Sequence, residues 1–351
     1  MRYVDLMGSK PHLLIGSRNN LGAETKVSYA PSTRFYLDDR AAGQPWVTRL
    51  PFPVHVVERV ETYDWVSRNR FVTRYSYHHG YYDGIEREFR GFGRVDQYDT
   101  EELGVLSESG AIPDAANIDA ASYVPPVLTK TWFHTGAYFD TARISRHFAH
   151  EYWREPDPAD GPTGLSDSKL PAGLNSSETA EALRSLKGAI LRQEVYALDG
   201  TEAADRPYTI SERNYTIERL QPLGPNRHAV FFTHARETAD FNYERKLFDV
   251  NGRKLADPRV THHLVLAVDD FGNQLQSVAI GYGRRRDDPD PLLTPADRAK
   301  QSKSHVVYTE TSYTNAILAE DDYRAPLPAD ARTRDKVQFK SATLRRRRDR
   351  Y

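Results

Sequence analysis

An alternating run of residues that leads into an Asp-Gly pair constrains the fold of this chain more than any other feature. Every second residue over 71–77 is Phe, Thr or Tyr, which is the period of a β-strand with one aromatic face. Asp83 and Gly84 follow, and Asp-Gly is typical of tight hairpins because glycine adopts positive φ without strain. The sequence therefore predicts an antiparallel hairpin over 75–95 that turns at Tyr82-Asp83-Gly84, with Gly84 in the left-handed conformation.

The return arm of this hairpin, residues 85–95, is dense in charge. A strand with so many charges cannot bury both faces in an apolar core, so we expect a wetted strand of a large sheet with charges paired across strands. The Gly-Phe-Gly within it indicates a β-bulge or a close backbone approach in a curved sheet. We single out a structural motif of Tyr82, Asp83, Gly84, Glu86, Arg87, Glu88, Phe89, Arg90, Gly91, Phe92 and Gly93.

Short strands separated by turn signals fill most of the remaining chain. The later part repeats one device, a strand followed by an acidic turn with glycine and another strand. Asp accepts local backbone hydrogen bonds and Gly takes the left-handed position, so this pattern encodes hairpins. The clearest early strands are 13–17, 25–29, 54–62 and 71–78, and the later turns are 198–200, 249–252 and 269–273.

Two segments carry helical signals. Residues 140–155 place apolar side chains at i, i+4 and i+8, and a helix there would end before Pro156. A second helix begins near Asn175, where Glu178 completes a capping box, and Gly188 stops it. The predicted fold class is mainly antiparallel β with two short helices, in two consecutive regions.

The composition narrows the classes of function. The 351 residues include no cysteine, which excludes disulfides, thiol nucleophiles, zinc ribbons and iron-sulfur clusters. A formal net charge of -1 argues against a dedicated nucleic-acid binder. The N-terminus lacks the pattern of a signal peptide, and no stretch approaches the roughly 18 apolar residues of a membrane helix.

The carboxylates and glycines of the hairpin motif suggest two kinds of site, and both patterns are incomplete. Glu86 and Glu88 are spaced like the paired glutamates of ADP-ribosyltransferases, but the upstream Arg and the Ser-Thr-Ser-like strand of that chemistry are not recognisable. Gly91-Phe92-Gly93 opens no helix and precedes no Gly-Lys-Ser/Thr, so it is a poor phosphate loop. Charge pairing and sheet curvature explain these residues better.

Paired histidines and aspartates also lack the spacing of known metal sites. Adjacent histidines on a strand point to opposite faces, so they are poor chelates. The run HFAHE differs from the HExxH of zinc proteases, and no DxDxDG calcium loop is present. We therefore predict hydrogen-bonded or exposed histidines, turn aspartates, and no metal or cofactor. The pairs are His78-His79, His147 with His150, His262-His263, Asp269-Asp270 and Asp321-Asp322.

Three segments together resemble one family. Residues 75–99, with Pro45–Val57 (PWVTRLPFPVHVV) and Thr131–Gly136 (TWFHTG), are similar to the middle region of the B component of insecticidal toxin complexes, which is related to SpvB-like virulence proteins. The resemblance is nearly unbroken from Asp5 to Arg334. In that family the middle region lies between a β-propeller and a run of Rhs/YD repeats.

The resemblance implies a secreted, structural segment without catalysis. It would form part of a curved Rhs-type β-shell that encloses an effector and would link this shell to the propeller. The implied partners are other parts of the B component, the C component with its effector, and the A (translocation) component, with no nucleic acid and no membrane insertion. The implied division is a propeller remnant at 1–12, a middle/N-terminal β region at 13–112, a middle/C-terminal β region with short helices at 113–335, and a basic, disordered or truncated tail at 336–351.

The residues themselves leave two other classes of function open. One alternative is an enzyme, either an ADP-ribosyltransferase or a carbohydrate-active β protein, which would need a pair of carboxylates in a cleft. The other is an adhesin-like binding module.

Overall fold

The computed structural model describes residues 12–100, 125–139, 144–155 and 164–335. The chain divides into two compact units, each built from segments that are not contiguous in sequence. The predicted propeller remnant up to residue 11, the predicted boundary between residues 112 and 113 and the predicted basic tail lie outside the described residues. Unit 1 comprises residues 1–80, 94–130 and 197–204, and unit 2 comprises 81–93, 131–196 and 205–351.

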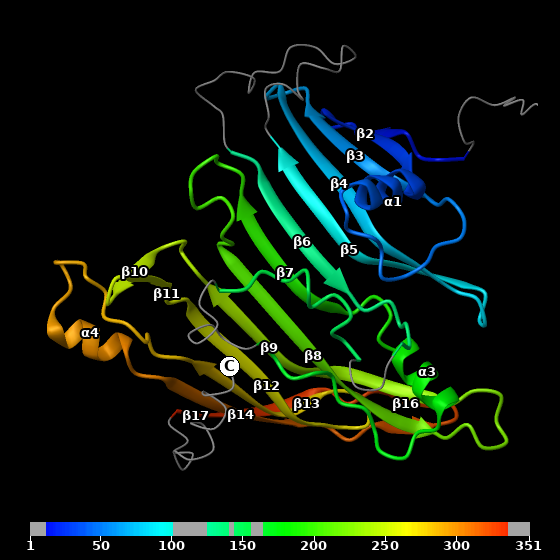
Figure 1. Cartoon of the computed structure of the whole chain (residues 1–351). Coiled ribbons are helices and arrows are strands. Elements are labelled where there is room, and N and C mark those ends of the chain that lie inside the picture. The colour runs from blue at the N-terminus through cyan, green and yellow to red at the C-terminus, as the bar shows by residue number, and fades with distance from the viewer. Residues whose placement is uncertain (1–11, 101–124, 140–143, 156–163, 336–351) are drawn as a thin grey trace, which may run out of the picture. The chain divides into compact units, whose positions relative to one another are not determined.

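Antiparallel strands that follow one another in sequence order form unit 1 (Figure 1). In the register of two of them, Val27 lies opposite Val60. Tyr63 and Val72 are each 2% exposed and lie in the core of this unit. The strands are β1 (Gly16–Arg18), β2 (Ala23–Pro31), β3 (His55–Asp64), β4 (Asn69–Asp83), β5 (Glu88–Thr100) and β6 (Val127–Phe133). The last residues of β4 and β6 and the first residues of β5 belong to unit 2.

One helix of unit 1, α1 (Ser32–Ala41), is absent from the sequence-based prediction. Only Ser32 and Phe35 of this helix are buried, so it has no apolar stripe of helical period by which a sequence reveals a helix. Tertiary packing holds it instead, because the ring of Phe35 lies 5.6 Å from that of Tyr77 on β4 in an edge-to-face contact.

Unit 2 is a longer series of antiparallel strands with two small hairpins beside it. The predicted turn at 249–252 is confirmed, because Asn251 and Gly252 have φ of 53° and 78°, as a two-residue hairpin turn of the mirror-image type requires. The main strands are β7 (Ile190–Ala197), β8 (Thr209–Gln221), β9 (Val230–Asn242), β12 (Arg259–Val268), β13 (Gln274–Gly281), β14 (His305–Tyr313) and β17 (Pro328–Asp335). The small hairpins are β10 (Leu247–Val250) with β11 (Arg253–Ala256), and β15 (Ile317–Ala319) with β16 (Asp322–Arg324).

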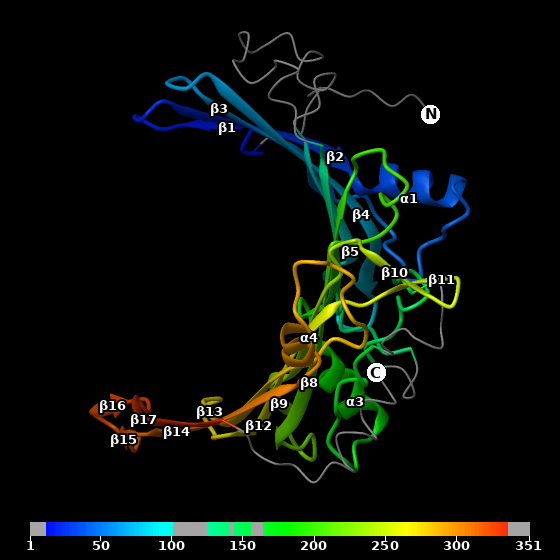
Figure 2. The same ribbon diagram turned by 90° about the vertical axis from the view of Figure 1, so that its left-hand side faces the viewer.

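Two helices accompany these strands. The predicted capping box is confirmed in α3 (Ser176–Arg184), where the side chain of Asn175 accepts from the amide of Glu178. This helix packs its apolar face against strands β8 and β9, beside which it lies in Figure 2. The other helix, α4 (Pro295–Gln301), has a capping box at Thr294 that the sequence also shows but that we did not predict. None of the described helices has the length and apolar character needed to cross a bilayer.

The helix predicted over 140–155 is wrong for its described part, residues 144–155, which form turns and bends. The carboxylate of Asp167 accepts from the backbone amides of Ile144 and Ser145 at 2.8 and 2.9 Å. Phe148 is nevertheless buried. The apolar side chains are therefore placed by tertiary contacts, which satisfy the backbone without a helix. The start of the prediction, Asp140, lies outside the described residues.

Candidate functional site

The hairpin that dominates the sequence is present, but its turn differs from the prediction. Strands β4 and β5 are neighbours joined by residues 84–87, a link short enough only for antiparallel strands. Asp83 Oδ1 accepts from the amides of Ile85 and Glu86 at 2.9 and 3.0 Å. The left-handed residue is Arg87, with φ of 51°, and not Gly84, where added side-chain atoms would meet open space. The predicted left-handed conformation of Gly84 is therefore wrong.

The preceding hairpin uses the same turn. Asp64 Oδ1 accepts from the amide of Val66 at 2.8 Å, and Arg68 has φ of 59°. In both turns an Asp begins the loop and an Arg four residues later takes the left-handed conformation, which costs a non-glycine residue some free energy. This repeated spacing of Asp and Arg was visible in the sequence and could have located both turns.

Arg90 lies at the centre of the hairpin end and is only 5% exposed. Its Nη1 donates to the backbone oxygen of Gly136 at 2.7 Å, and its Nη2 lies 3.0 Å from Asp83 Oδ2. Burial acts to raise the pKa of Asp83, but hydrogen bonds from backbone amides and the charge of Arg90 outweigh it and lower the pKa. The expectation of a wetted strand is wrong here, because the charge is buried together with its partners.

The loop that receives Arg90 is itself tightly determined. Gly136 has φ of 71°, and a Cβ added to it would lie 3.0 Å from the Cα of Arg184 at the end of α3. The amide of Gly136 donates to Nδ1 of buried His134, whose Nε2 lies 2.8 Å from the backbone oxygen of Ile144. Burial lowers the pKa of His134 to about 4, so the neutral ring accepts at Nδ1 and donates at Nε2.

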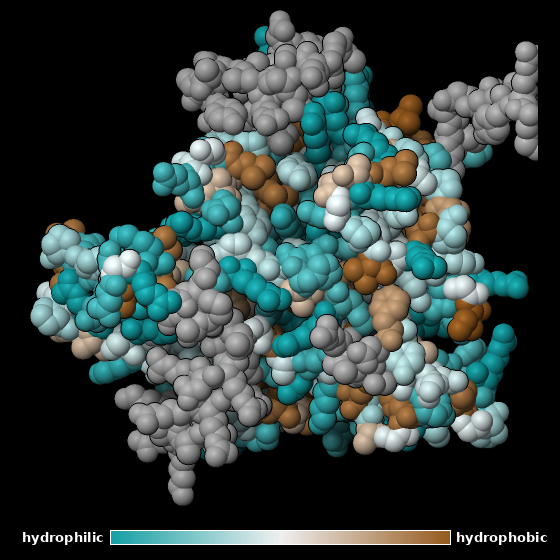
Figure 3. Space-filling view, in the orientation of Figure 1, coloured by the Kyte–Doolittle hydropathy of each residue, from teal (hydrophilic) through white to brown (hydrophobic). Residues whose placement is uncertain are grey.

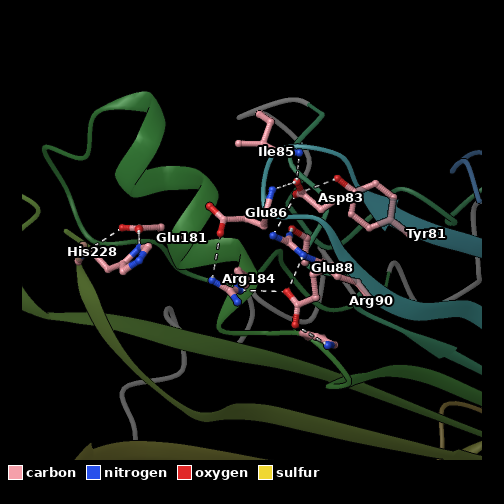
Figure 4. A network of polar contacts seen from close by, with 12 residues as sticks. Tyr81, Asp83, Ile85, Glu86, Glu88, Arg90, Glu181, Arg184 and His228 are labelled. Carbon is pink, nitrogen blue, oxygen red and sulfur yellow. Dashed lines mark hydrogen bonds and ion pairs between the residues drawn. The ribbon is translucent and has the colours of Figure 1, made fainter.

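The two glutamates of the motif pair with the end of α3 and not with a neighbouring strand, as Figure 4 shows. Glu88 accepts from Arg184 Nε at 3.1 Å and from Lys187 Nζ at 2.9 Å. The hydrogen bond from Lys187 is the main cause that lowers the pKa of Glu88. Glu86 Oε2 lies 3.8 Å from Arg184 Nη1. The expected cross-strand pairing of these glutamates is therefore wrong.

The same helix also binds the loop between β8 and β9. The carboxylate of Glu181 lies 2.8 Å from His228 Nδ1 and accepts from the amide of Ala229 at 2.8 Å (Figure 4). Glu178, besides capping α3, accepts from the amide of Leu223 at 3.0 Å. Helix α3 therefore joins the hairpin end to the β8–β9 loop through polar contacts on its two sides.

The glycines and aromatic residues of the motif support the sheet. Gly91 has φ of 89° within β5 and open space at its Cβ position, which supports the predicted bulge and not a close approach at this residue. The rings of Phe89 and Phe92 lie 5.6 Å apart, edge to face. Tyr82 is half-buried, and Gly93 is buried.

The paired histidines and aspartates of the sequence do not assemble a metal site in the described part of the chain. His262 is buried against Glu237 whereas His263 is exposed, which confirms the predicted divergence for this pair. Asp269 accepts from the amides of its own turn, as predicted. His78 and His79 are both buried and hydrogen-bonded.

A cavity of about 370 Å³ in unit 2 is lined by none of the hairpin residues. Its wall includes a buried cluster that the sequence did not reveal. Arg192 donates to Glu194 at 2.6 Å and also to Glu212, and its guanidinium lies 4.9 Å from the ring centre of Tyr152. Both carboxylates therefore share one arginine as a partner.

Taken together, the hairpin site is a set of internal contacts. Its carboxylates accept from Arg, Lys or backbone amides, and its residues line neither of the two cavities described in unit 2. On the face seen in Figure 3, the coloured hydrophobic residues are scattered among hydrophilic ones. This arrangement can fasten a strand pair to a helix, and it offers no carboxylate pair in a cleft.

Comparisons with known proteins point to one family. Residues 3–136 match the family described as "Insecticide toxin TcdB middle/N-terminal region", and residues 181–325 match "Insecticide toxin TcdB middle/C-terminal region". A comparison with curated protein sequences returned no match.

Solved structures agree with this family. The chain is similar to the crystal structure of TcdB2-TccC3, with 28% identity, a TM-score of 0.75, and coverage of 95% of this chain and 16% of that one. It is also similar to TcdB2-TccC3 without the hypervariable C-terminal region (29%, 0.75, 95% and 15%). A third similar structure is the Photorhabdus luminescens Tc holotoxin pore with a TccC3 mutation (29%, 0.75, 94% and 15%). The chain thus spans about one sixth of the chains it matches.

Proposed function

Because the chain belongs to the middle region of the B component of insecticidal toxin complexes, we propose that it forms part of the wall of a hollow β-shell. In this role its strands continue into neighbouring strands of the B component, and the shell encloses an effector. The chain also connects this wall to the propeller that docks on the translocation component.

The observation that carries the proposal is the fastening of the hairpin. A wall that excludes solvent needs strands that are locked to their supports, and buried ion pairs with full hydrogen bonding supply such specificity. Arg90 contributes by bonding to Gly136 and Asp83, and Glu88 contributes by bonding to α3. These two charges of the motif are thus paired with other parts of the same chain.

The same contacts support a role without catalysis. A carboxylate pair that transfers ADP-ribose or cleaves a glycoside must face a cleft that admits substrate. Glu86 and Glu88 instead share Arg184 as a partner. The proposed activity of the chain is therefore structural, and any toxic activity belongs to the enclosed effector.

The proposed partners follow from the family and from the printed descriptions of the similar structures, which contain TcdB2 with TccC3. They are the remaining parts of the same B component, the C component with its effector, and the A component. The proposed location is extracellular. Within this arrangement, residues 1–12 end the preceding propeller, 13–112 and 113–335 are the two middle β regions, and 336–351 form a basic tail.

A protease-protection experiment tests the proposal. The complete B component that contains this chain is assembled with its C component, and the effector is exposed to a nonspecific protease. We expect the effector to resist digestion until denaturant opens the assembly. Free effector serves as the control. Digestion of the assembled effector at the rate of the free effector would contradict the role as a shell wall.

A further inference from the structure

Residues 32–54 of unit 1, here called the strap, comprise α1 and the segment that follows it. The strap is closed at its base by two hydrogen bonds between Ser32 and Val54, which join Ser32 N to Val54 O at 2.8 Å and Val54 N to Ser32 Oγ at 2.9 Å. Between these residues the strap contacts β4 through several pairs, which are Phe35 with Tyr77, Asp39 with His78, Val47 with His79 and Thr48 with Gly80. The nature of those contacts therefore decides how firmly it stays closed.

The contact at the end of α1 converges on one carboxylate. Asp39 Oδ2 accepts from Trp46 Nε1 at 2.6 Å, within the strap. The same oxygen lies 2.6 Å from Nδ1 of His78 on β4, which is 8% exposed. One oxygen of Asp39 thus contacts both Trp46, in the segment after α1, and His78 on strand β4.

A second carboxylate flanks the other side of the same ring. His78 Nε2 lies 3.5 Å from Asp96 Oδ2 on β5, and Asp96 is also paired with Arg94, whose Nε is 3.0 Å from Oδ1. Lys130 on β6 acts on Asp96 electrostatically. Only an imidazolium carries a proton on both nitrogens, so only the charged ring interacts favourably with both carboxylates.

We propose that His78 is a pH-sensitive latch, which holds the strap on strand β4 while it is protonated and releases the Asp39 end of the strap when it loses its proton. This device lies in unit 1 and does not rest on the proposed role in a shell. Loss of one proton removes the positive charge of the ring, so the short contact between Nδ1 and Asp39 changes from a charge-assisted hydrogen bond to a weaker neutral one, and the attraction of Nε2 to Asp96 is lost.

The titration of His78 determines the direction of the effect. Burial acts to lower the pKa of His78, but the hydrogen bond to Asp39 and the nearby carboxylate of Asp96 outweigh burial and raise the pKa above its ordinary value of 6.5. A raised pKa in the folded state gives stability that is complete below 6.5 and is lost as the pH rises through the raised value. The strap should therefore loosen on the alkaline side.

The neighbouring His79 cannot supply the same effect. Its Nδ1 accepts from the amide of Val47 in the strap at 3.0 Å, and this contact exists only while Nδ1 carries no proton. A proton on Nδ1 of His79 would therefore break a contact with the strap, whereas a proton on His78 strengthens one. The direction of the pH dependence distinguishes the two residues.

Hydrogen exchange of the B component that contains this chain tests the latch. Peptides from residues 32–54 are followed between pH 6 and 9, with exchange corrected for its intrinsic pH dependence. We expect protection to fall about tenfold for each unit by which the pKa of His78 is raised. His78→Gln should remove this dependence, and His228→Gln, which alters an exposed histidine of unit 2, should retain it.

A titration by nuclear magnetic resonance keeps the test decisive if His78→Gln fails to fold. Asp96→Asn leaves the contact with Asp39 in place and should shift the midpoint of both the ring titration and the loss of protection to lower pH. The latch would be refuted if His78 titrates without a change in protection of the strap, or if either midpoint is insensitive to Asp96→Asn.

Discussion

The replacement Arg90→Leu tests whether the hairpin end is fastened by its buried charge. It removes the donor to the Gly136 oxygen, at 2.7 Å, and the partner of Asp83, at 3.0 Å. It also removes a weaker contact with Glu88 at 3.3 Å. Leucine fills part of the volume but offers no donor, so the oxygens that faced the guanidinium lose a partner.

The expected cost follows from what each partner retains. Removal of one member of a buried ion pair costs about 3 to 5 kcal/mol when the remaining charge is left uncompensated. Asp83 keeps two backbone amide donors and is 15% exposed, and Glu88 keeps Arg184 and is 29% exposed. The low end of the range applies, about 3 kcal/mol, which corresponds to roughly 150-fold in an opening equilibrium.

Hydrogen exchange of peptides from residues 81–93 and 131–137, in the intact B component, measures this opening. The matched control is Lys187→Gln, which removes a 2.9 Å contact with Glu88 from a side chain that is 38% exposed. An exposed pair of this kind is worth at most about 1 kcal/mol, or roughly fivefold. If Arg90→Leu accelerates exchange no more than this control does, Arg90 does not fasten the hairpin and the carrying observation of the proposed function is lost.

Four further predictions follow from particular contacts. Gly136→Ala should cost about 1 to 3 kcal/mol from positive φ and from the close approach of α3, whereas Gly84→Ala should be nearly neutral, as differential unfolding midpoints would report. The lowered pKa values of Asp83 and Glu88 predict hairpin stability that is present above their ordinary values of 3.8 and 4.5 and is lost as the pH falls through the lowered values, which a pH series of exchange rates checks. Incubation with labelled nicotinamide dinucleotide and protein acceptors, and with glycans, should yield no turnover, and activity abolished by Glu88→Gln would contradict the structural role. The excised chain should aggregate, because every residue of β17 is exposed and β14 is its one partner among the described strands; a sharp, reversible, monomeric unfolding transition would instead indicate an autonomous domain.

The strands and hairpins were predictable because their determinants are local. Alternation of side chains requires only neighbouring residues, and an Asp or Gly satisfies a turn from within it. The capping box of α3 is equally local, since Asn175 and Glu178 lie three residues apart. Thr294 with Asp297 shows the same signature for α4, so that omission was one of interpretation and not of missing information.

The helix predictions are wrong where a contact with a residue distant in sequence replaces a local hydrogen bond or local packing. The helix predicted over 140–155 fails over 144–155 because the carboxylate of Asp167 takes up amides that a helix would have used. Helix α1 forms although it has no apolar stripe, since Phe35 packs on Tyr77. The periodicity of apolar residues indicates which secondary structure a segment favours by itself. Contacts with distant residues then determine whether that structure forms.

The sequence by itself determined a mainly antiparallel β fold, because strand alternation and hairpin turns depend on adjacent residues. The resemblance of three segments to the toxin-complex family was also visible in the sequence. Only the tertiary structure determined which charged side chains are buried and which residues they pair with. The sequence predicted that Glu88 and Arg90 lie on a wetted strand with charges paired across strands, yet Glu88 bonds to α3 and Arg90 is buried against Gly136. A charge is stable in the interior only when partners arrive from elsewhere in the chain, and those partners lie 46 and 96 residues away.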